Sequence, residues 1–257
     1  MTNIGHIIAA ARTDQGRVRD HNEDFLVVRQ PEDADDETRH GWLFIVADGV
    51  GGADAGEVAS RFAAEQTVQH YLANHNPLQW GARLQQAIAT AHNDLCDLIA
   101  SREGQRRMGT TLVAALLATN NEIVFANVGD SRAYIYRYNR IRQITKDHSL
   151  VVKLLEEGII TEEEAAELKI SNIILQSIGS EHPPQIDLFY ELLATGDKIL
   201  LCSDGLNTHV ADDEMAYILS QHAPPEAAKK LVELANLRGG LDNISVIVLE
   251  YTGGELS

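Results

Sequence analysis

Short runs of apolar residues, separated by Gly, Asn, Asp and Pro, recur along the whole chain and are typical of β-strands. Several of these runs follow one another across short turns, and the clearest hairpin has its turn at Asn120-Asn121. The pattern predicts strands at about 5–11, 24–29, 42–47, 111–118, 122–128, 133–138, 141–144, 186–191, 198–203 and 244–250.

Longer segments between these runs carry apolar residues at helical spacing. In one of them Thr161 and Glu164 have the spacing of a capping box, which marks the start of a helix. Grouped hairpins with amphipathic helices between the groups favour an α+β fold, an α-β-β-α sandwich of two antiparallel sheets. The helices are expected at 56–73, 78–101, 149–157, 161–168, 212–220 and 225–237.

The chain has 257 residues, of which 44% are hydrophobic and 23% charged, as in a soluble globular protein. No long linker divides it, so we expect a single domain over residues 1–257. The first residues lack the basic and apolar regions of a signal peptide, and no apolar run has the length of a membrane helix. We therefore expect no membrane association and a cytoplasmic location.

The net charge of −17, with scattered basic residues, argues against a nucleic-acid partner. The acidic run 32–37 is interpreted as a solvated loop rather than a metal or partner site. Cys96 and Cys202 are interpreted as buried apolar thiols. Cys96 and Arg102 have the spacing of cysteine-dependent phosphatases, but the segment between them has a helical pattern, no glycine and an acid beside the thiol.

Three acidic stretches at the edges of strand-like runs carry the candidate chemistry: Asp48-Gly49, Asp204-Gly205 and Asp242-Asn243. One Asp-Gly pair alone is more often a turn. A fold that gathers three such carboxylates near Asp130 would need cations, because burying unpaired carboxylates together is costly. Asp oxygens without Cys or His alongside favour Mg²⁺ or Mn²⁺ over zinc.

The glycine-rich turn after Asp48 allows a main-chain carbonyl to join such a site. A dinucleotide fingerprint is a weak reading of this turn, because Asp54 stands where the third glycine should be.

Seven motifs in one order resemble the metal-dependent Ser/Thr protein phosphatases of the PP2C (PPM) family in their compact bacterial form. They cover nearly the whole chain and are specific as a set. The motifs are Thr13-Asp14-x-Gly16-x-x-Arg19-x-x-Asn22-Glu23-Asp24, Ala47-Asp48-Gly49-x-Gly51-Gly52, Gly109-Thr110-Thr111, Asn127-Val128-Gly129-Asp130-Ser131-Arg132, Thr145-x-Asp147-His148-Ser149, Leu201-x-Ser203-Asp204-Gly205-Leu206 and Asp242-Asn243-Ile244-Ser245.

The resemblance implies a site with two Mn²⁺ or Mg²⁺ ions. Asp48 would bridge both ions, with Asp204 and Asp242 completing the first and the Gly49 carbonyl serving the second. Asp130 would share a third metal site with Asp204.

The resemblance also assigns roles around the metals. Glu23 and Asp24 would hold metal-bound waters, and Arg19 would bind the phosphate through its planar fork of donors. Two such ions would lower the pKa of a water held between them, and the resemblance implies that this water is the nucleophile toward phosphorus. The implied activity is hydrolysis of phosphoserine and phosphothreonine in proteins.

One position departs from the family pattern: Ala53 stands where members commonly carry the histidine that is the usual candidate for the leaving-group acid. We hypothesise that Asp54, His21 or a metal-bound water substitutes, or that phosphoserine reacts more slowly than esters with acidic leaving groups.

Further expectations follow for partners and alternatives. The substrates are expected to be proteins phosphorylated by a cognate Ser/Thr kinase. A phosphorylated regulator of the anti-anti-sigma type is the alternative target for the same enzyme. The protein is expected to be a monomer. The segment 149–178 corresponds to the family's mobile flap, and within it a packing or capping role is favoured for His148. A pseudophosphatase that only binds phosphoproteins is the alternative, motivated by Ala53.

Overall fold

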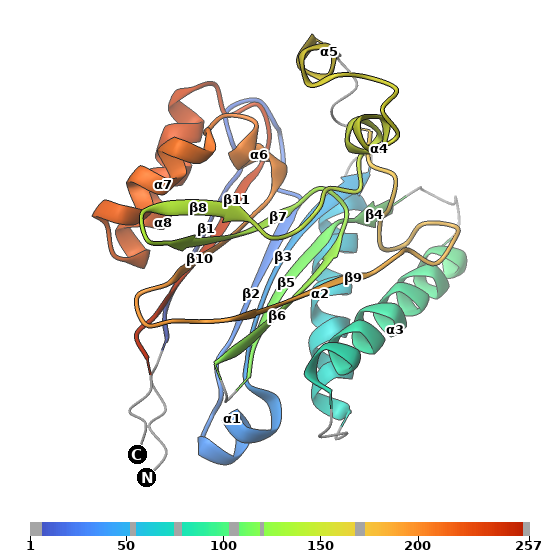
Figure 1. Cartoon of the computed structure of the whole chain (residues 1–257). Coiled ribbons are helices and arrows are strands. Elements are labelled where there is room, and N and C mark those ends of the chain that lie inside the picture. Colours follow the sequence, from blue (N-terminus) through green and yellow to red (C-terminus); the bar gives the residue numbers. More distant parts are fainter. Residues whose placement is uncertain are drawn as a thin grey trace.

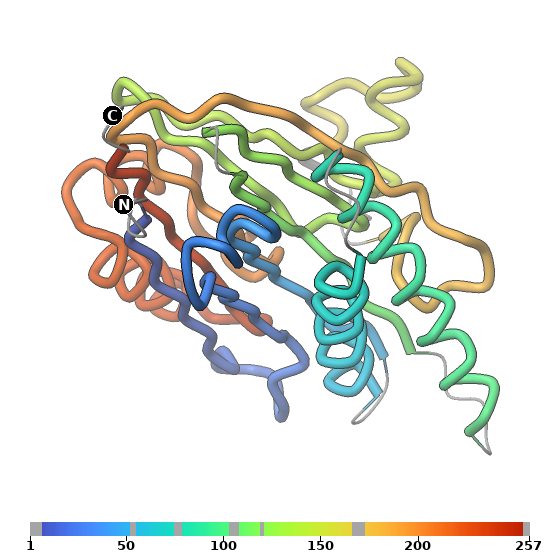
Figure 2. The backbone as a smooth tube through the Cα atoms, turned by 90° about the horizontal axis from the view of Figure 1, so that it is seen from below, coloured from blue at the N-terminus to red at the C-terminus, as the bar shows by residue number. Residues whose placement is uncertain are grey.

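The computed structural model describes residues 7–51, 55–74, 79–102, 108–118, 121–167 and 173–253. Two antiparallel sheets pack face to face, and helices cover the outer face of each sheet (Figure 1). Viewed from below, the two helical layers lie on opposite sides with the strands between them (Figure 2). The expected α-β-β-α sandwich is thus confirmed.

One sheet has the strand order β1-β11-β10-β7-β8. Its strands are β1 (Ile7–Asp14), β7 (Arg132–Arg137), β8 (Arg140–Gln143), β10 (Lys198–Cys202) and β11 (Ile244–Tyr251). The other sheet has the order β2-β3-β5-β6-β9, and β4 pairs with the end of β3. Its strands are β2 (Asp24–Arg29), β3 (Trp42–Gly51), β4 (Met108–Thr110), β5 (Leu112–Leu117), β6 (Glu122–Val128) and β9 (Asp187–Leu192).

The helices fall into an outer layer on each sheet and a projecting pair. α2 (Ala55–Ala73) and α3 (Trp80–Ser101) cover the β3-containing sheet, whereas α7 (Asp212–Gln221) and α8 (Pro224–Leu237) cover the other. α4 (Leu150–Glu156) and α5 (Glu162–Glu167) project beyond one end of the sandwich (Figure 1). The remaining helices are α1 (Ala34–His40) and α6 (Asp204–Asn207).

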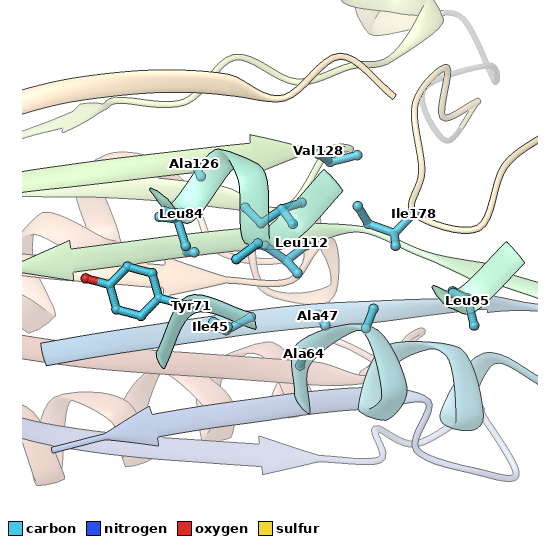
Figure 3. Packing of buried hydrophobic residues seen from close by; sticks show 14 of the residues in the cluster. Ile45, Ala47, Ala64, Tyr71, Leu84, Leu95, Leu112, Ala126, Val128 and Ile178 are labelled. Carbon is cyan, nitrogen blue, oxygen red and sulfur yellow. The ribbon is translucent and has the colours of Figure 1, made fainter. Parts of the chain in front are cut away.

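The sequence of β3 is a continuous apolar run because both faces of the strand are buried. Leu43, Ile45 and Ala47 face the layer of α2 and α3, and Phe44 and Val46 face the other sheet. Because successive side chains point to opposite faces and both faces are covered, every position must be apolar. In Figure 3, Tyr71 of α2 lies beside Ile45 of this strand and Ala64 lies beside Ala47, in the outer core layer.

The acidic run at 32–37 is not a loop, and this prediction was wrong. Asp33 caps α1 by accepting a hydrogen bond from the Asp36 N–H at 2.8 Å, and Asp36 pairs with Arg29 of β2. The acids therefore stabilise the N-terminus of a short helix between β2 and β3. The acidic side chains of this segment therefore have a structural role.

Two local features predicted from the sequence, the capping box and the hairpin, are present in the structure. The capping box is confirmed, since Thr161 and Glu164 exchange backbone and side-chain hydrogen bonds. β5 and β6 pair as the expected hairpin, although Asn120 of its turn lies outside the described residues. The short elements β4 and α6 were not predicted. No helix in the described part of the chain is long and apolar enough to cross a bilayer.

Candidate metal centre

The antiparallel topology brings the acidic motifs to one end of the sandwich. Asp48 lies near the end of β3, directly opposite Asp24 at the start of β2. Asp204 follows the end of β10, and Asp242 precedes the start of the neighbouring β11. Asp130 lies in the connection from β6 to β7. In an antiparallel pair, the end of one strand lies beside the start of its partner. The acids at these strand ends, five in all from the two packed sheets, therefore share one region.

The backbone of Asp48 is fixed by two threonines. Its carbonyl accepts hydrogen bonds from the Thr110 hydroxyl at 2.8 Å and the Thr111 N–H at 2.9 Å. Its N–H donates to the Thr111 hydroxyl at 3.1 Å. The Asp48 side chain is therefore presented from a rigid strand end rather than from a mobile loop.

Mutual repulsion and burial perturb these carboxyl groups strongly. Burial, followed by the charges of Asp24, Asp204, Asp130 and Asp242, raises the pKa of Asp48 well above its usual value. The Asp48 and Asp204 carboxyl groups are close enough for each to shift the pKa of the other. Carboxyl groups that cannot all be ionised together compete for protons in the absence of cations.

The other buried acids behave in the same way. Burial raises the pKa of Asp24 to about 7 and of Asp130 to about 7, with the neighbouring Asp204 adding to each shift. Burial and the Asp242 charge raise the pKa of Asp204 to about 6. One side-chain oxygen each of Asp24 and Asp130 is buried without a hydrogen-bond partner. Orphan carboxylate oxygens of this kind fit hard divalent cations or their waters.

Arg19 reaches the same site from the connection between β1 and β2. Its Nη2 donates to Asp242 Oδ2 at 2.6 Å, and both side chains are partly exposed. The Asp242 hydrogen bond raises the pKa of Arg19, with the Glu23 and Asp48 charges adding to the shift. An exposed guanidinium beside the acidic cluster can contact an anionic substrate.

Glu23 is packed closely against the backbone at Gly49 and against the start of α2. Its carbonyl accepts hydrogen bonds from the Gly49 N–H at 3.2 Å and the Ser60 hydroxyl at 2.6 Å. A Cβ on Gly49 would lie 2.3 Å from the Gly56 carbonyl oxygen, so glycine is required there. Burial raises the pKa of Glu23, and the Arg19 charge opposes that shift.

The structure brings together Arg19, Glu23, Asp24, Asp48, Gly49, Asp130, Asp204 and Asp242. Among the described residues, no three His, Cys, Asp or Glu side chains already surround one point as a complete set of ligands. Asp242 is turned toward Arg19 instead. His21 is exposed and close enough for its charge to influence Glu23. Ala53 and Asp54 lie outside the described residues.

Sequence reasoning missed the residues that hold this cluster together. Ser203 donates to Asp24 Oδ2 at 2.8 Å. The buried Asn243 side chain bonds to the backbone of Gln15, His21 and Glu23. Both residues belong to motifs that were recognised, but neither signals by itself which distant backbone it contacts.

His148 has a partner carboxylate that the sequence did not reveal. Its Nε2 lies 3.1 Å from Asp187 Oδ2, and its Nδ1 accepts the Gly129 N–H at 3.2 Å. The buried imidazole thus links β9 to the connection that carries Asp130. The expected packing role fits this contact.

Cys96 lies inside α3, and burial together with the Asp97 charge raises the pKa of its thiol. The helix and the raised pKa leave no support for a phosphate loop at this cysteine.

The chain is similar to known proteins over most of its length. A family model described as "Protein phosphatase 2C" matches residues 29–236. The "Serine/threonine phosphatase stp" of Listeria monocytogenes serotype 4b is 39% identical over 249 residues, covering 94% of this chain and 95% of that protein. The match therefore spans nearly the full length of both sequences.

Solved structures agree in fold. Serine/threonine phosphatase Stp1 from Staphylococcus aureus superposes with a TM-score of 0.86 at 34% identity, covering 98% of each chain. The catalytic domain of serine threonine protein phosphatase PstP, described in complex with 2 manganese ions, gives a TM-score of 0.81 at 33% identity and covers 95% of this chain and 97% of that one.

Proposed function

The chain belongs to the protein phosphatase 2C family, and from this premise we propose that its acidic cluster is the metal centre of a serine/threonine protein phosphatase. The protein is an enzyme that hydrolyses phosphoserine and phosphothreonine in proteins. The alternative of a pseudophosphatase has no support, because the relatives are named serine/threonine phosphatases.

The crowding of buried carboxyl groups is the observation that carries the metal assignment. Asp24, Asp48, Asp130 and Asp204 all have raised pKa values, so their ionised forms are disfavoured by burial and by one another. The donor set is all oxygen, which suits Mg²⁺ or Mn²⁺. The manganese in the PstP structure favours Mn²⁺ as the first ion to test.

The individual roles are part of the same proposal. Asp48 would bridge two ions, with Asp204 and Asp242 on one and the Gly49 carbonyl on the other. Asp130, with its orphan oxygen, would hold a third ion with Asp204. When bound, such ions would lower the pKa of water and offset charge on the phosphoryl oxygens.

The chain's own residues orient the substrate. Arg19 would turn its free donors toward the phosphoryl group while its Nη2 stays near Asp242, giving a fixed approach to phosphorus. Glu23 and Asp24 would accept hydrogen bonds from waters at the site. The threonine contacts to Asp48 and the Ser203 bond to Asp24 would keep these acceptors in place.

His21 and Asp54 remain our proposals for protonating the leaving alkoxide. The exposed position of His21, close to Glu23, allows it to reach a bound ester. Comparing p-nitrophenyl phosphate with a phosphoserine peptide tests this, because only the peptide needs an acid. Loss of peptide turnover alone in His21→Ala or Asp54→Asn is expected, and an unchanged ratio of the two rates would remove the idea.

Several broader expectations also stay proposals. Phosphorylated proteins are the substrates, and a cognate Ser/Thr kinase in the cytoplasm would produce them. We propose a monomer, a single domain, and a flap at about 149–178, of which residues 168–172 lie outside the described part. The projection of α4 and α5 beyond the sandwich supports the flap (Figure 1).

Hydrolysis of p-nitrophenyl phosphate with and without Mn²⁺ tests the proposed function. Activity is expected only with metal, and Asp204→Asn should lower it by roughly a hundredfold or more. Asp35→Asn is the matched control, because this acid is exposed on α1. α1 connects the end of β2 to the start of β3, so it lies at the opposite end of these strands from Asp24 and Asp48. Metal-independent turnover, or full activity in Asp204→Asn, would contradict the assignment.

A further inference from the structure

Two large apolar side chains are exposed beside the Arg19–Asp242 ion pair. Val18 is 61% exposed and Leu241 is 56% exposed. The Arg17 N–H donates to the Gly240 carbonyl at 2.7 Å, and Arg19 Nη2 lies 2.6 Å from Asp242 Oδ2. These two contacts bracket Val18 and Leu241, so the side chains stand on adjoining segments at the rim of the site.

The rim is held in place before any ligand arrives. A Cβ on Gly16, whose φ is +83°, would lie 2.2 Å from the Asp242 carbonyl oxygen, so the two segments are in direct backbone contact. Leu241 donates its N–H to His209 Nε2 at 3.1 Å. Preorganisation of this kind lowers the entropic cost of binding.

Single exposed apolar residues are ordinary, but these two flank Arg19 and Asp242, which the proposed function assigns to the phosphoryl group and to the metal. A phosphorylated segment with its phosphate at Arg19 must place its next residues within a few ångströms of that point, because one extended residue spans only about 3.5 Å. Its neighbouring side chains therefore reach this rim. Contact with an apolar side chain would remove Val18 and Leu241 from water.

Resting on the proposed function, we propose that Val18 and Leu241 form a specificity site for a large apolar residue adjoining the phosphorylated serine or threonine. The occupant is a segment of the substrate protein, because the rim is continuous with the phosphoryl-binding group. The preference is for protein substrates with leucine-like flanking residues over those with polar ones.

A competing apolar contact is offered by one exposed side chain between the projecting helices α4 and α5. Ile159, in the connection between these helices, is 61% exposed. In Figure 1 the connection from β1 to β2 lies beside α6, across the same end of the sandwich from α4. The two surfaces can therefore be tested separately.

Steady-state kinetics with two phosphoserine peptides test the proposal. One peptide carries leucine on both sides of phosphoserine and the other carries asparagine, with all other residues identical. The measured quantity is the ratio of their kcat/KM values within each enzyme variant, which cancels any general change in rate. The variants at the rim are Val18→Ser, Leu241→Ser and their combination. Ile159→Ser and Leu192→Ser are the controls. Leu192 is an exposed apolar residue that pairs with Glu122 at the start of β6, at the opposite end of that strand from Asp130.

Wild-type enzyme should prefer the leucine peptide by about fivefold to tenfold, as expected for partial burial of apolar side chains. The ratio should fall toward one in the double variant and be intermediate in each single variant, while Ile159→Ser and Leu192→Ser keep it. No preference in the wild type, a ratio unchanged by the double variant, or loss of the ratio in Ile159→Ser would overturn the proposal.

The same experiment separates this inference from the function on which it rests. Metal-dependent hydrolysis of both peptides without any preference would overturn the specificity site and leave the phosphatase assignment intact. Absence of metal-dependent hydrolysis would overturn both.

Discussion

The buried side chain of Asn243 fixes the position of the connection between β1 and β2 at this site. Its Nδ2 donates to the carbonyls of Gln15 at 2.9 Å and His21 at 2.8 Å, and its Oδ1 accepts the Glu23 N–H at 2.8 Å. The residue is only 5% exposed. It therefore ties the connection that carries Arg19 and Glu23 to the segment that carries Asp242, which makes it a positioning residue.

Removing this amide should affect substrate use more than metal binding. In Asn243→Ala, three part-buried backbone groups lose a partner, at a cost of about 1–3 kcal/mol in total, because the Gln15 and His21 residues are exposed and water can partly replace the amide. Displacement of Arg19 should lower kcat/KM for p-nitrophenyl phosphate by about 10-fold to 100-fold, chiefly through KM. Kinetics together with Mn²⁺ titration by calorimetry measure the two effects.

Gln85→Ala is the matched control for Asn243→Ala. It removes one exposed amide hydrogen bond, which runs from α3 to the Ile186 carbonyl just before β9. Both kinetic constants should stay at the wild-type values in this variant. An equal loss of kcat and Mn²⁺ affinity in Asn243→Ala, without a rise in KM, would contradict a positioning role.

At the scale of elements, the start of α2 is fitted against Glu23 without space for a methyl group. A Cβ on Gly56 would lie 2.7 Å from the Glu23 carboxyl carbon. The Glu23 backbone cannot retreat easily, because its N–H is bound by Asn243 and its carbonyl by Ser60. The helix start and the acid must therefore be considered as one unit.

Gly56→Ala should lower activity even though alanine favours helices by about 1 kcal/mol over glycine. The added methyl group displaces the Glu23 carboxyl group, and we expect a fall of roughly tenfold in kcat/KM, consistent with misplacement of a group at the site. Enzyme kinetics and thermal unfolding of the same preparation measure both effects.

Gly81→Ala in the first turn of α3 provides the contrasting helix variant. Its Cβ would meet only the hydroxyl end of Tyr190, a side chain that is 55% exposed and can move away. Unchanged activity and a Tm equal to or a few degrees above wild type are expected. If both glycine variants lose activity to the same extent, the close fit at Gly56 is not the cause.

At the scale of the whole molecule, the acidic end of the sandwich opposes folding when no divalent cation is bound. Burial raises the pKa of Asp24 and Asp130 to about 7 and of Asp204 to about 6, from an ordinary value of 3.8. Between about pH 4 and 7 the folded protein therefore holds protons that the unfolded chain has released, and its stability falls as pH rises.

In EDTA, the Tm should consequently decrease from pH 5 to pH 8. Each kcal/mol lost corresponds to about 2–4 °C for a protein of this size. Carboxyl groups with lowered pKa, such as Asp36 and Glu214, do not reverse this trend, because their contribution is lost only below about pH 4.5. Burial lowers the pKa of His92, which opposes the trend below about pH 6.5, but it is one group against several acids with raised pKa. Differential scanning calorimetry at several pH values measures the slope.

Mn²⁺ should raise the Tm most at pH 8, because cations bind the deprotonated carboxylates and stabilise the folded state. Asp130→Asn should flatten the pH dependence in EDTA, since it removes one of the groups with a raised pKa. A Tm in EDTA that is constant or rises between pH 5 and pH 8 would contradict the coupling of buried carboxyl groups.

The amino-acid sequence by itself determined the long elements, the sandwich and the family. Period-two and helical patterns report burial over many residues, so strands such as β3 and helices such as α3 could be predicted within a few residues. The order of the motifs around Asp48, Asp204 and Asp242 indicated the chemistry, because oxygen ligands at strand ends suit hard cations.

Only the tertiary structure decided how those acids are held and which side chains surround them. α1, β4 and α6 are too short to show a period, and although Asp33 caps α1 locally, the pairing of β4 with β3 and the placement of α6 come from packing. Ser203 and Asp24 are 179 positions apart, and Asn243 and Gln15 are 228 apart. Contacts at such separations, and the pKa shifts they accompany, exist only after both sheets have assembled, so no local pattern could reveal them.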